Sequence, residues 1–221
     1  MNELSIIQNI CVWTLPVLLA IVLHEVAHGW AAYQLGDPTA KFSGRLTLNP
    51  LPHIDILGTV VLPILFLILP TPFLFGWAKP VPVNFKALRY PKRDMALVAL
   101  AGPVSNLLMA LGWGAILKLG VIISQQSLDW AKPVIYLIYL GQAGIFINLI
   151  LGLINLLPIP PLDGSKILYS VLPPKALMAY QRLEPFGFMI IIALLALGLM
   201  GRMMAPLLMG AYQIILSLYQ L

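Results

Sequence analysis

The sequence predicts an all-α polytopic membrane protein with about five or six membrane segments, a short β element, and a re-entrant or extended segment near its functional site. The 221-residue chain is 60% hydrophobic and only 10% charged, and its mean hydropathy is +0.93. A soluble domain of this size could not bury so much apolar surface. Several apolar runs also reach the roughly 20 residues that are needed to cross about 30 Å of hydrocarbon.

The apolar runs are expected to form the membrane segments in chain order. The residues before the first run include Glu3 and no basic side chain, so they do not resemble a cleaved signal peptide, and we expect the first helix to be retained. The last run is long enough for one tilted helix or a broken pair. The runs are 10–35, 56–75, 95–119, 134–157 and 186–219.

We expect one membrane domain over residues 1–221, with a core at 10–170 and C-terminal helical segments at 186–219. The net charge of +5 does not indicate a nucleic-acid partner, because the bases do not form a stripe with interleaved aromatic residues. They lie in short loops beside the apolar runs, as expected of a protein embedded in a lipid bilayer. Cys11 is the single cysteine, which excludes an internal disulfide and a cysteine metal cluster.

Ionisable residues inside the first apolar run indicate a functional site. Residues 24–28 read HEVAH, and a charged group at bilayer depth costs roughly 2.5–3.5 kcal/mol. Residues i and i+4 of an α-helix share a face, so His24 and His28 can present imidazole nitrogens to one ion, while Glu25 lies near a water bound to it. This spacing is typical of zinc hydrolases.

A catalytic zinc takes three protein ligands, so one ligand must come from elsewhere in the chain. Asp163 is favoured by its context, since it follows the run 134–157 and a proline-rich segment. Unwound backbone of this kind survives at membrane depth only where protein or a wet cavity satisfies it, and it is a plausible arm for a ligand. The other candidates are His53, Glu3, Asp37, Asp55, Asp94, Asp129 and Glu184.

Each of these features also has a structural interpretation. The pentad could be a solvated helix end with two ordinary histidines, but this explains neither a buried Glu25 nor the segment before Asp163. An Asp-Gly pair alone is typical of a turn, and Gly102 with the following proline is typical of a packing or kink site.

His53 is interpreted as an interfacial histidine at the start of a helix, with gating or transient metal binding as the alternative. Three asparagines could link helices through hydrogen bonds: Asn106, Asn148 and Asn155.

Three motifs together resemble the site-2 protease family of intramembrane zinc metalloproteases. They are HEVAHG at 24–29, AGPVSN at 101–106 and NLLPIPPLDG at 155–164. The order of the motifs also matches, and they extend over most of the chain. In addition, GWAKPVPVN at 76–84 resembles the compact bacterial branch of the family, which lacks an added soluble module.

The resemblance implies that His24, His28 and Asp163 ligate one zinc ion per chain and that Glu25 is the general base. It also implies that Asn155 holds substrate near the metal or stabilises the oxyanion. The expected protein is an intramembrane zinc metalloendopeptidase of the bacterial inner membrane, which cleaves in or near transmembrane segments of other proteins. The main rival is a metal-ion transporter or metal-binding membrane protein without proteolysis. An inactive scaffold is a third interpretation, against which the intact motifs argue.

The metal site constrains the topology, because His24 and His28 must lie on the same membrane side as Asp163. Simple alternation of all runs would separate them, so we expect 56–75 to be re-entrant or the chain to return extended through 78–83. If the N-terminus is external, most bases then lie on the cytoplasmic side of the membrane. We expect the site to open toward this side. These bases are Lys41, Arg45, Lys79, Lys86, Arg89, Lys92, Arg93, Lys166, Lys175 and Arg182, with Lys118 and Lys132 opposite.

Two segments are expected to supply the β element. Lys41–Leu48 is interpreted as a short strand, and Ala78–Val83 could supply a second extended stretch. By resemblance to the family, such strands near the active site would handle substrate. Adding an extended substrate to a strand edge would expose its peptide bond to the metal.

Overall fold

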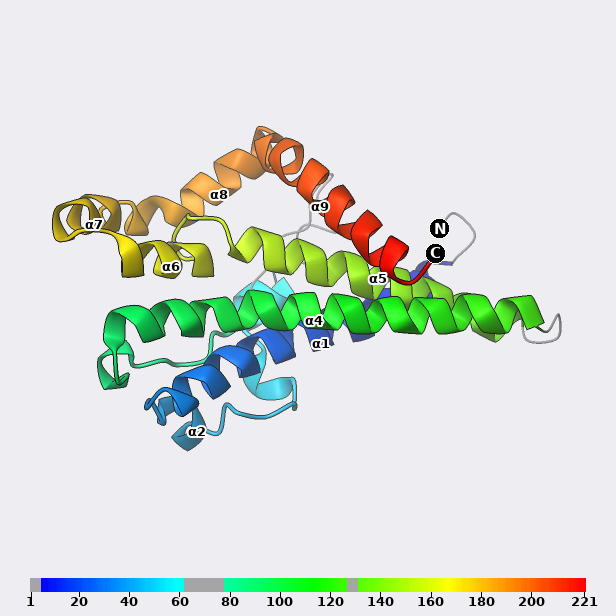
Figure 1. Ribbon diagram of the computed structural model, residues 1–221, viewed down its shortest axis with the longest axis horizontal. Helices are drawn as coiled ribbons and strands as arrows, with labels where there is room; N and C mark the ends of the chain where they lie inside the picture. The colour runs from blue at the N-terminus through cyan, green and yellow to red at the C-terminus, as the bar shows by residue number, and fades with distance from the viewer. Residues whose placement is uncertain (1–4, 62–77, 127–130) are drawn as a thin grey trace. The chain divides into compact units, whose positions relative to one another are not determined.

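The computed structural model describes residues 5–61, 78–126 and 131–221, and over these residues it is largely helical and contains no strand (Figure 1). Five helical segments of this described part are long and apolar enough to span a bilayer. They are Ile7–Gln34, Pro91–Gln126, Val134–Asn155, Pro174–Ala196 and Leu199–Leu218. The predicted all-α polytopic membrane fold is therefore confirmed.

Short helical turns stand between the long helices. In chain order the described helices are α1 (Ile6–Gln34), α2 (Thr39–Phe42), α4 (Pro91–Gln126), α5 (Ala131–Asn155), α6 (Asp163–Val171), α7 (Pro174–Gln181), α8 (Gly187–Ala196) and α9 (Leu199–Leu218). The turns are η1 (Leu51–His53), η2 (Ile56–Val61), η3 (Phe85–Ala87) and η4 (Glu184–Phe186). Of the run 56–75, η2 is the described part and the remainder lies outside the described residues, so a re-entrant path there stays a prediction.

The run 186–219 is a broken pair rather than one tilted helix. α8 ends at Ala196 and α9 begins at Leu199, and Gly198 between them has a φ of +67°. This left-handed conformation is one that glycine adopts without steric cost. The Gly198 N–H bonds back to the Leu195 carbonyl at 3.0 Å, so a left-handed glycine follows the end of α8 as it follows many helices.

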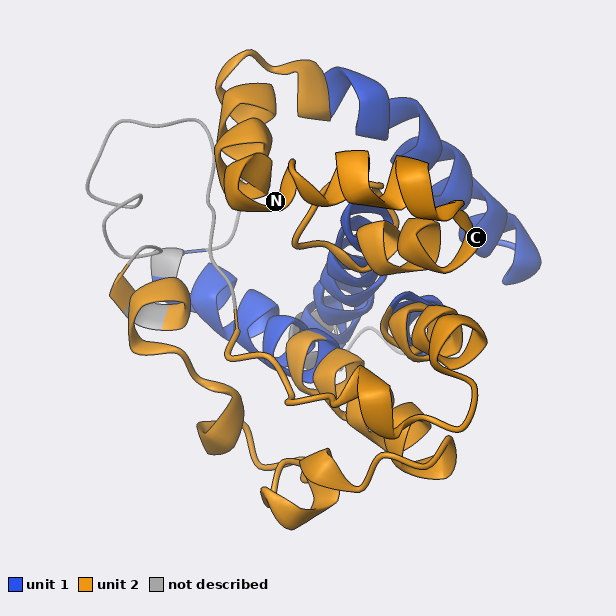
Figure 2. Ribbon diagram, turned by 90° about the vertical axis from the view of Figure 1, so that its left-hand side faces the viewer, with its two compact units in different colours: residues 1–20, 103–155, 201–221 blue, residues 21–102, 156–200 orange. Residues whose placement is uncertain are grey.

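Figure 2 shows two compact units within the chain. Unit 1 comprises residues 1–20, 103–155 and 201–221, and unit 2 comprises residues 21–102 and 156–200. α1 and α4 each contribute residues to both units. His24, His28 and Asp163 all fall in unit 2.

Unit 1 is packed around close approaches between α4 and α5. A β-carbon on Gly144 would overlap the Trp113 ring, and a β-carbon on Gly141 would lie 2.8 Å from Leu117. Small residues allow helix backbones to approach in this way inside membranes. The buried core of the unit contains Ala110, Trp113, Leu117, Ile145, Leu149, Leu208 and Ile215.

Asn106 and Asn148 link helices of unit 1, as predicted. The Asn106 Nδ2 donates to Asn148 Oδ1 at 3.0 Å and to the Ala20 carbonyl at 3.3 Å, which connects α4 with α5 and α1. Both side chains are fully buried, where an unmet polar group would be costly. Asn155 is different, since its Nδ2 donates to the Leu151 carbonyl of its own helix at 3.0 Å.

Unit 2 packs the C-terminal half of α1 against the first turns of α4 and the segment that precedes them. Its apolar cluster includes Ala32, Leu88 and Val98. Asp37, fully buried just after α1, accepts the Asn84 N–H at 2.6 Å and the Thr39 N–H at 3.0 Å. The Asp37 carboxylate therefore binds both the segment that directly follows α1 and the segment around Asn84.

The strand predicted at Lys41–Leu48 is wrong. Thr39–Phe42 forms the helical turn α2 instead, because Asp37 accepts the Thr39 N–H and the Phe42 N–H bonds to the Pro38 carbonyl at 3.0 Å. Gly44 follows with a left-handed φ of +66°. Side-chain hydrogen bonding by an aspartate before the segment has outweighed the β preference of the residues within it.

The second part of the expected β element, Ala78–Val83, carries neither helix nor strand. The Lys79 N–H bonds to the His53 carbonyl at 2.9 Å, and the Val81 N–H bonds to the Glu25 carboxylate at 2.7 Å. These amides are therefore paired with groups other than a neighbouring strand. No β element forms in the described part of the chain.

Candidate metal centre

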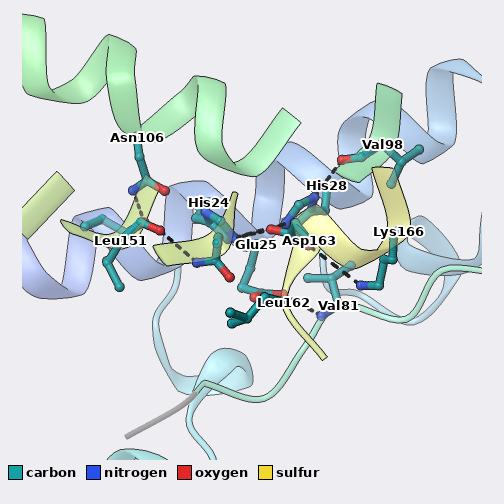
Figure 3. A network of polar contacts seen from close by, with 12 residues as sticks. His24, Glu25, His28, Val81, Val98, Asn106, Leu151, Leu162, Asp163 and Lys166 are labelled. Atoms are coloured by element: carbon teal, nitrogen blue, oxygen red, sulfur yellow. Dashed lines mark hydrogen bonds and ion pairs between the residues drawn. The ribbon is translucent and has the colours of Figure 1, made fainter. Parts of the chain in front are cut away.

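Three side chains from α1 and α6 converge on one point in unit 2 (Figure 3). His24 Nε2 lies 3.0 Å from His28 Nε2, and Asp163 Oδ2 lies 3.2 Å and 3.1 Å from these two nitrogens. Relative exposure is 7% for His24, 8% for His28 and 6% for Asp163. A helix pair at i and i+4 and a carboxylate distant in sequence thus form one buried triad of ligand atoms.

The triad has the dimensions and chemistry of a metal site. Zinc bonds of about 2.0–2.1 Å in a tetrahedron place neighbouring ligand atoms roughly 3.3 Å apart, close to the three separations observed. Among the described residues, the buried Asp163 Oδ2 accepts no hydrogen bond of good geometry, although both imidazoles are beside it. Two imidazoles and one carboxylate suit zinc and several other divalent metals.

His28 is oriented by the backbone of α4. Its Nδ1 lies 2.7 Å from the Val98 carbonyl oxygen (Figure 3). A carbonyl only accepts, so Nδ1 carries the proton and donates it, and the Nε2 lone pair is left for the metal. An outer hydrogen bond of this kind fixes the tautomer and the ring orientation of a ligand histidine.

Gly102 allows α4 to lie directly against the two ligand histidines. A β-carbon at this position would overlap His28 Nε2 and would lie 2.5 Å from His24 Cε1. The packing interpretation of Gly102 is therefore confirmed, and the surfaces it packs against are the imidazoles themselves. Its occurrence in the motif at 101–106 was the sequence signal for this role.

Asp163 begins α6 and is held by the backbone around it. A β-carbon on Gly164 would overlap the carbonyl oxygens of Leu156 and Leu157, so the residue after the ligand must be glycine for the turn to close. Tyr180 from α7 adds a hydrogen bond to the Pro158 carbonyl at 2.6 Å. Glycine packing and this tyrosine contact together fix the proline-rich segment that delivers the carboxylate.

The charge state of Asp163 suits a ligand. Burial alone would raise the pKa of this carboxyl, but the two imidazoles beside it lower the pKa below its usual value, so the group is a carboxylate. Lys166 Nζ lies 3.7 Å from Asp163 Oδ1, the oxygen that does not face the histidines. Sequence reasoning had placed Lys166 only among the cytoplasmic bases; its i, i+3 spacing from Asp163 on α6 was the available signal.

Glu25 lies beside the ligand pair and is half-buried. Its Oε2 accepts the Val81 N–H at 2.7 Å (Figure 3). This contact joins α1 to the segment 78–84 and was not foreseen, because a backbone amide leaves no residue-type signature in a sequence.

The remaining ligand candidates in the described residues are engaged elsewhere or exposed. His53 is buried, and its Nε2 lies 3.0 Å from the Thr47 carbonyl. Asp94 accepts the Tyr90 N–H at 2.9 Å and pairs with Arg93. Asp37 and Asp55 accept backbone amides, and Glu184 is exposed. Glu3 and Asp129 lie outside the described residues.

Asn155, the expected substrate-binding residue, stands at the C-terminal end of α5 in unit 1. It is half-buried, and its Nδ2 is engaged by the Leu151 carbonyl. A role toward substrate therefore stays a prediction for this residue.

Comparison with known proteins identifies relatives over nearly the whole chain. The family described as Peptidase family M50 matches residues 117–198. A Bacillus subtilis protein named "Putative zinc metalloprotease YwhC" is 36% identical over 205 residues, which are 93% of this chain and 89% of the relative. Proteins with the same description under the name Rip2 are 31% identical in Mycolicibacterium smegmatis and 30% identical in Mycobacterium tuberculosis, where the matches cover 66% and 63% of the relatives. No solved structure matches the chain significantly.

Proposed function

The chain belongs to peptidase family M50, and from this premise we propose that it hydrolyses peptide bonds in or near transmembrane segments of other membrane proteins at the centre formed by His24, His28 and Asp163. It is an integral membrane protein and a zinc metalloprotease of the site-2 type. The observation that carries the proposal is the convergence of three buried ligand atoms at separations of 3.0–3.2 Å.

In this proposal His24, His28 and Asp163 hold one zinc ion per chain. Zinc would supply the Lewis acidity that activates water for attack on a peptide carbonyl at neutral pH. The Nδ1–H of His28 donates to the Val98 carbonyl, which leaves Nε2 as the nitrogen that faces the metal and holds the ring in its orientation. The pairing of Lys166 with Asp163 Oδ1 supports binding of the metal through Oδ2.

Glu25 is the general base of the proposed reaction. Its Oε2 is engaged by the Val81 N–H, so we assign proton transfer to Oε1. There the carboxylate takes a proton from the attacking water and later returns it to the leaving amine. Asn155 is assigned to hold the substrate or to stabilise the oxyanion through its amide.

We place the protein in the bacterial inner membrane as one domain over residues 1–221, with the site opening toward the cytoplasm. The contact of His28, near the end of α1, with Val98, near the start of α4, supports a connection that leaves and returns on one membrane side. α4 and α5 then cross out and back before Asp163. This path agrees with the side on which the basic loops gather.

The test compares purified wild type with Glu25→Gln in detergent and in vesicles. We expect about one zinc per chain in both proteins and cleavage of a model transmembrane substrate by wild type alone, because glutamine cannot accept the proton. His24→Ala should lose both zinc and cleavage. Metal in both proteins with no cleavage of a broad substrate panel would favour transport or binding, and absence of metal from wild type would remove the central assignment.

A further inference from the structure

One peptide group, the amide between Pro80 and Val81, lies between a buried arginine and the proposed general base. Its N–H donates to Glu25 Oε2 at 2.7 Å, and its carbonyl oxygen accepts from Arg45 Nη2 at 3.2 Å. The same Nη2 also donates to the Lys79 carbonyl at 2.7 Å. A cation and a carboxylate thus stand at the two ends of a single peptide dipole.

Arg45 is a buried arginine whose guanidinium is not paired with an acidic side chain in the described part of the chain. It is 8% exposed, and no carboxylate of the described residues forms an ion pair with it. Buried charges are normally paired or fully hydrogen-bonded. Here the compensation comes from two backbone carbonyls and, through the peptide, from Glu25. Hydrogen bonds in such a chain polarise and strengthen one another.

The backbone N–H groups around this peptide are bonded to partners outside their own segment. Pro80 and Pro82 have no N–H to satisfy, so Val81 offers the only amide among these three residues. The Lys79 N–H is taken by the His53 carbonyl at 2.9 Å and the Asn84 N–H by Asp37 at 2.6 Å. The Pro80–Val81 peptide is therefore fixed from both sides.

We propose that Arg45 is a positioning residue for Glu25, acting through the Pro80–Val81 peptide. By holding the carbonyl end of the peptide, Arg45 keeps the Val81 N–H aimed at Oε2, which fixes the carboxylate plane and leaves Oε1 for the proton. This inference rests on the proposed role of Glu25 and deepens it. Arg45 does not touch the ligand triad, so its loss should leave metal binding unchanged.

The first test measures kinetics and zinc content of Arg45→Gln, Arg45→Lys and the control Arg89→Gln, which removes an exposed base of the same unit. We expect kcat of Arg45→Gln to fall about 10- to 100-fold, with KM within about twofold and zinc retained. Both hydrogen bonds come from one nitrogen, and the buried Nε makes none in the described part. A lysine ammonium should therefore rescue much of kcat. Arg89→Gln should match wild type.

The second test needs no proteolysis and measures amide hydrogen exchange by mass spectrometry. A peptide fragment over residues 78–82 reports on Val81 alone, because the first two residues of a fragment lose their label during the measurement and Pro80 and Pro82 have no N–H. Exchange at Val81 should rise in Arg45→Gln and in Glu25→Ala but not in Arg89→Gln. In the double variant that combines Arg45→Gln with Glu25→Ala, the Val81 amide should exchange no faster than in Glu25→Ala, because both changes break the same chain of hydrogen bonds.

These outcomes separate the two proposals. If wild type does not cleave but the exchange pattern is as expected, the hydrogen-bonded chain from Arg45 through the Pro80–Val81 peptide to Glu25 stands. The proposed reaction then fails. If Arg45→Gln leaves Val81 exchange and kcat at wild-type values, the positioning role is overturned while the protease assignment is untouched. Loss of zinc or of the fold in Arg45→Gln together with failure of Arg45→Lys to restore kcat would also overturn it, since Arg45 would then be a general structural residue.

Discussion

Gly102 of α4 lies so close to His28 that a β-carbon on the glycine would overlap the Nε2 atom that faces the metal centre. The same hypothetical carbon would lie 2.5 Å from His24 Cε1. Backbone packing of one helix therefore limits the rotation of both ligand imidazoles on another. The metal centre depends on a residue that has no side chain.

Gly102→Ala should weaken zinc binding by at least about tenfold, the scale of changes to groups that orient metal ligands. The methyl group must displace one or both imidazoles. Gly112→Ala on the same helix is the matched control, because its β-carbon would meet nothing within 4 Å. Zinc affinity is measured by competition with a fluorescent chelator. Equal affinities for the two variants would show that the imidazoles tolerate the displacement.

Gly164→Ala should displace the ligand Asp163, because the added carbon would overlap the carbonyl oxygens of Leu156 and Leu157. We expect loss of bound zinc and a lower melting temperature. Backbone cannot move aside as a flexible side chain can, so the effect should exceed that of Gly201→Ala, where space is open. Retention of zinc and of the wild-type melting temperature by Gly164→Ala would contradict this account.

Much of the ligand triad could be predicted because its members have chemical signatures. His24 and His28 are spaced to share a helix face, and Asp163 follows a segment whose prolines exclude helix. The bonds that orient the site could not be predicted, because they come from backbone: the Val98 carbonyl on His28 and the Val81 amide on Glu25. Any residue type could have supplied either group.

The errors in the fold prediction have local causes. A strand was expected at Lys41–Leu48 from its residue types, but Asp37, outside that segment, starts a helical turn by accepting the Thr39 amide. α6 and α7 were not foreseen as helices, because each spans only two or three turns and short amphipathic runs are ambiguous. The long apolar helices were foreseen because length and hydropathy suffice for them.

Lys166→Gln should weaken zinc binding by several-fold, less than the 10- to 100-fold typical of closely bonded outer partners. The Nζ lies 3.7 Å from Asp163 Oδ1 and the lysine side chain is 37% exposed, so solvent screens much of the interaction. Lys175→Gln, an exposed base in α7, is the control. A zinc affinity of Lys166→Gln equal to that of Lys175→Gln would exclude any role of Lys166 in holding the carboxylate.

Asn106 and Asn148 should be coupled in stability. A double-mutant cycle with alanine at both positions isolates their 3.0 Å hydrogen bond, for which membrane proteins give an average of about 0.6 kcal/mol. Unfolding in mixed micelles measures the four proteins. Since both asparagines lie in unit 1, each single variant should retain zinc. If the loss of unfolding free energy in the double variant equals the sum of the two single losses, the hydrogen bond between the two side chains contributes nothing to stability.

Zinc removal should destabilise wild type, because the metal joins ligands from α1 and α6, two helices that are far apart in the sequence. A metal that binds only the folded protein stabilises it by about 2.7 kcal/mol when its free concentration is 100 times its Kd. Chelation should therefore lower the melting temperature of wild type, and added zinc should restore it.

In Asp163→Ala the ligand set is incomplete, so chelator and zinc should change its melting temperature little. His53→Gln should respond as wild type does, since His53 bonds to Thr47 and lies outside the triad. A full zinc response in Asp163→Ala would mean that another residue supplies the third ligand; a lost response in His53→Gln would point to His53 as that residue.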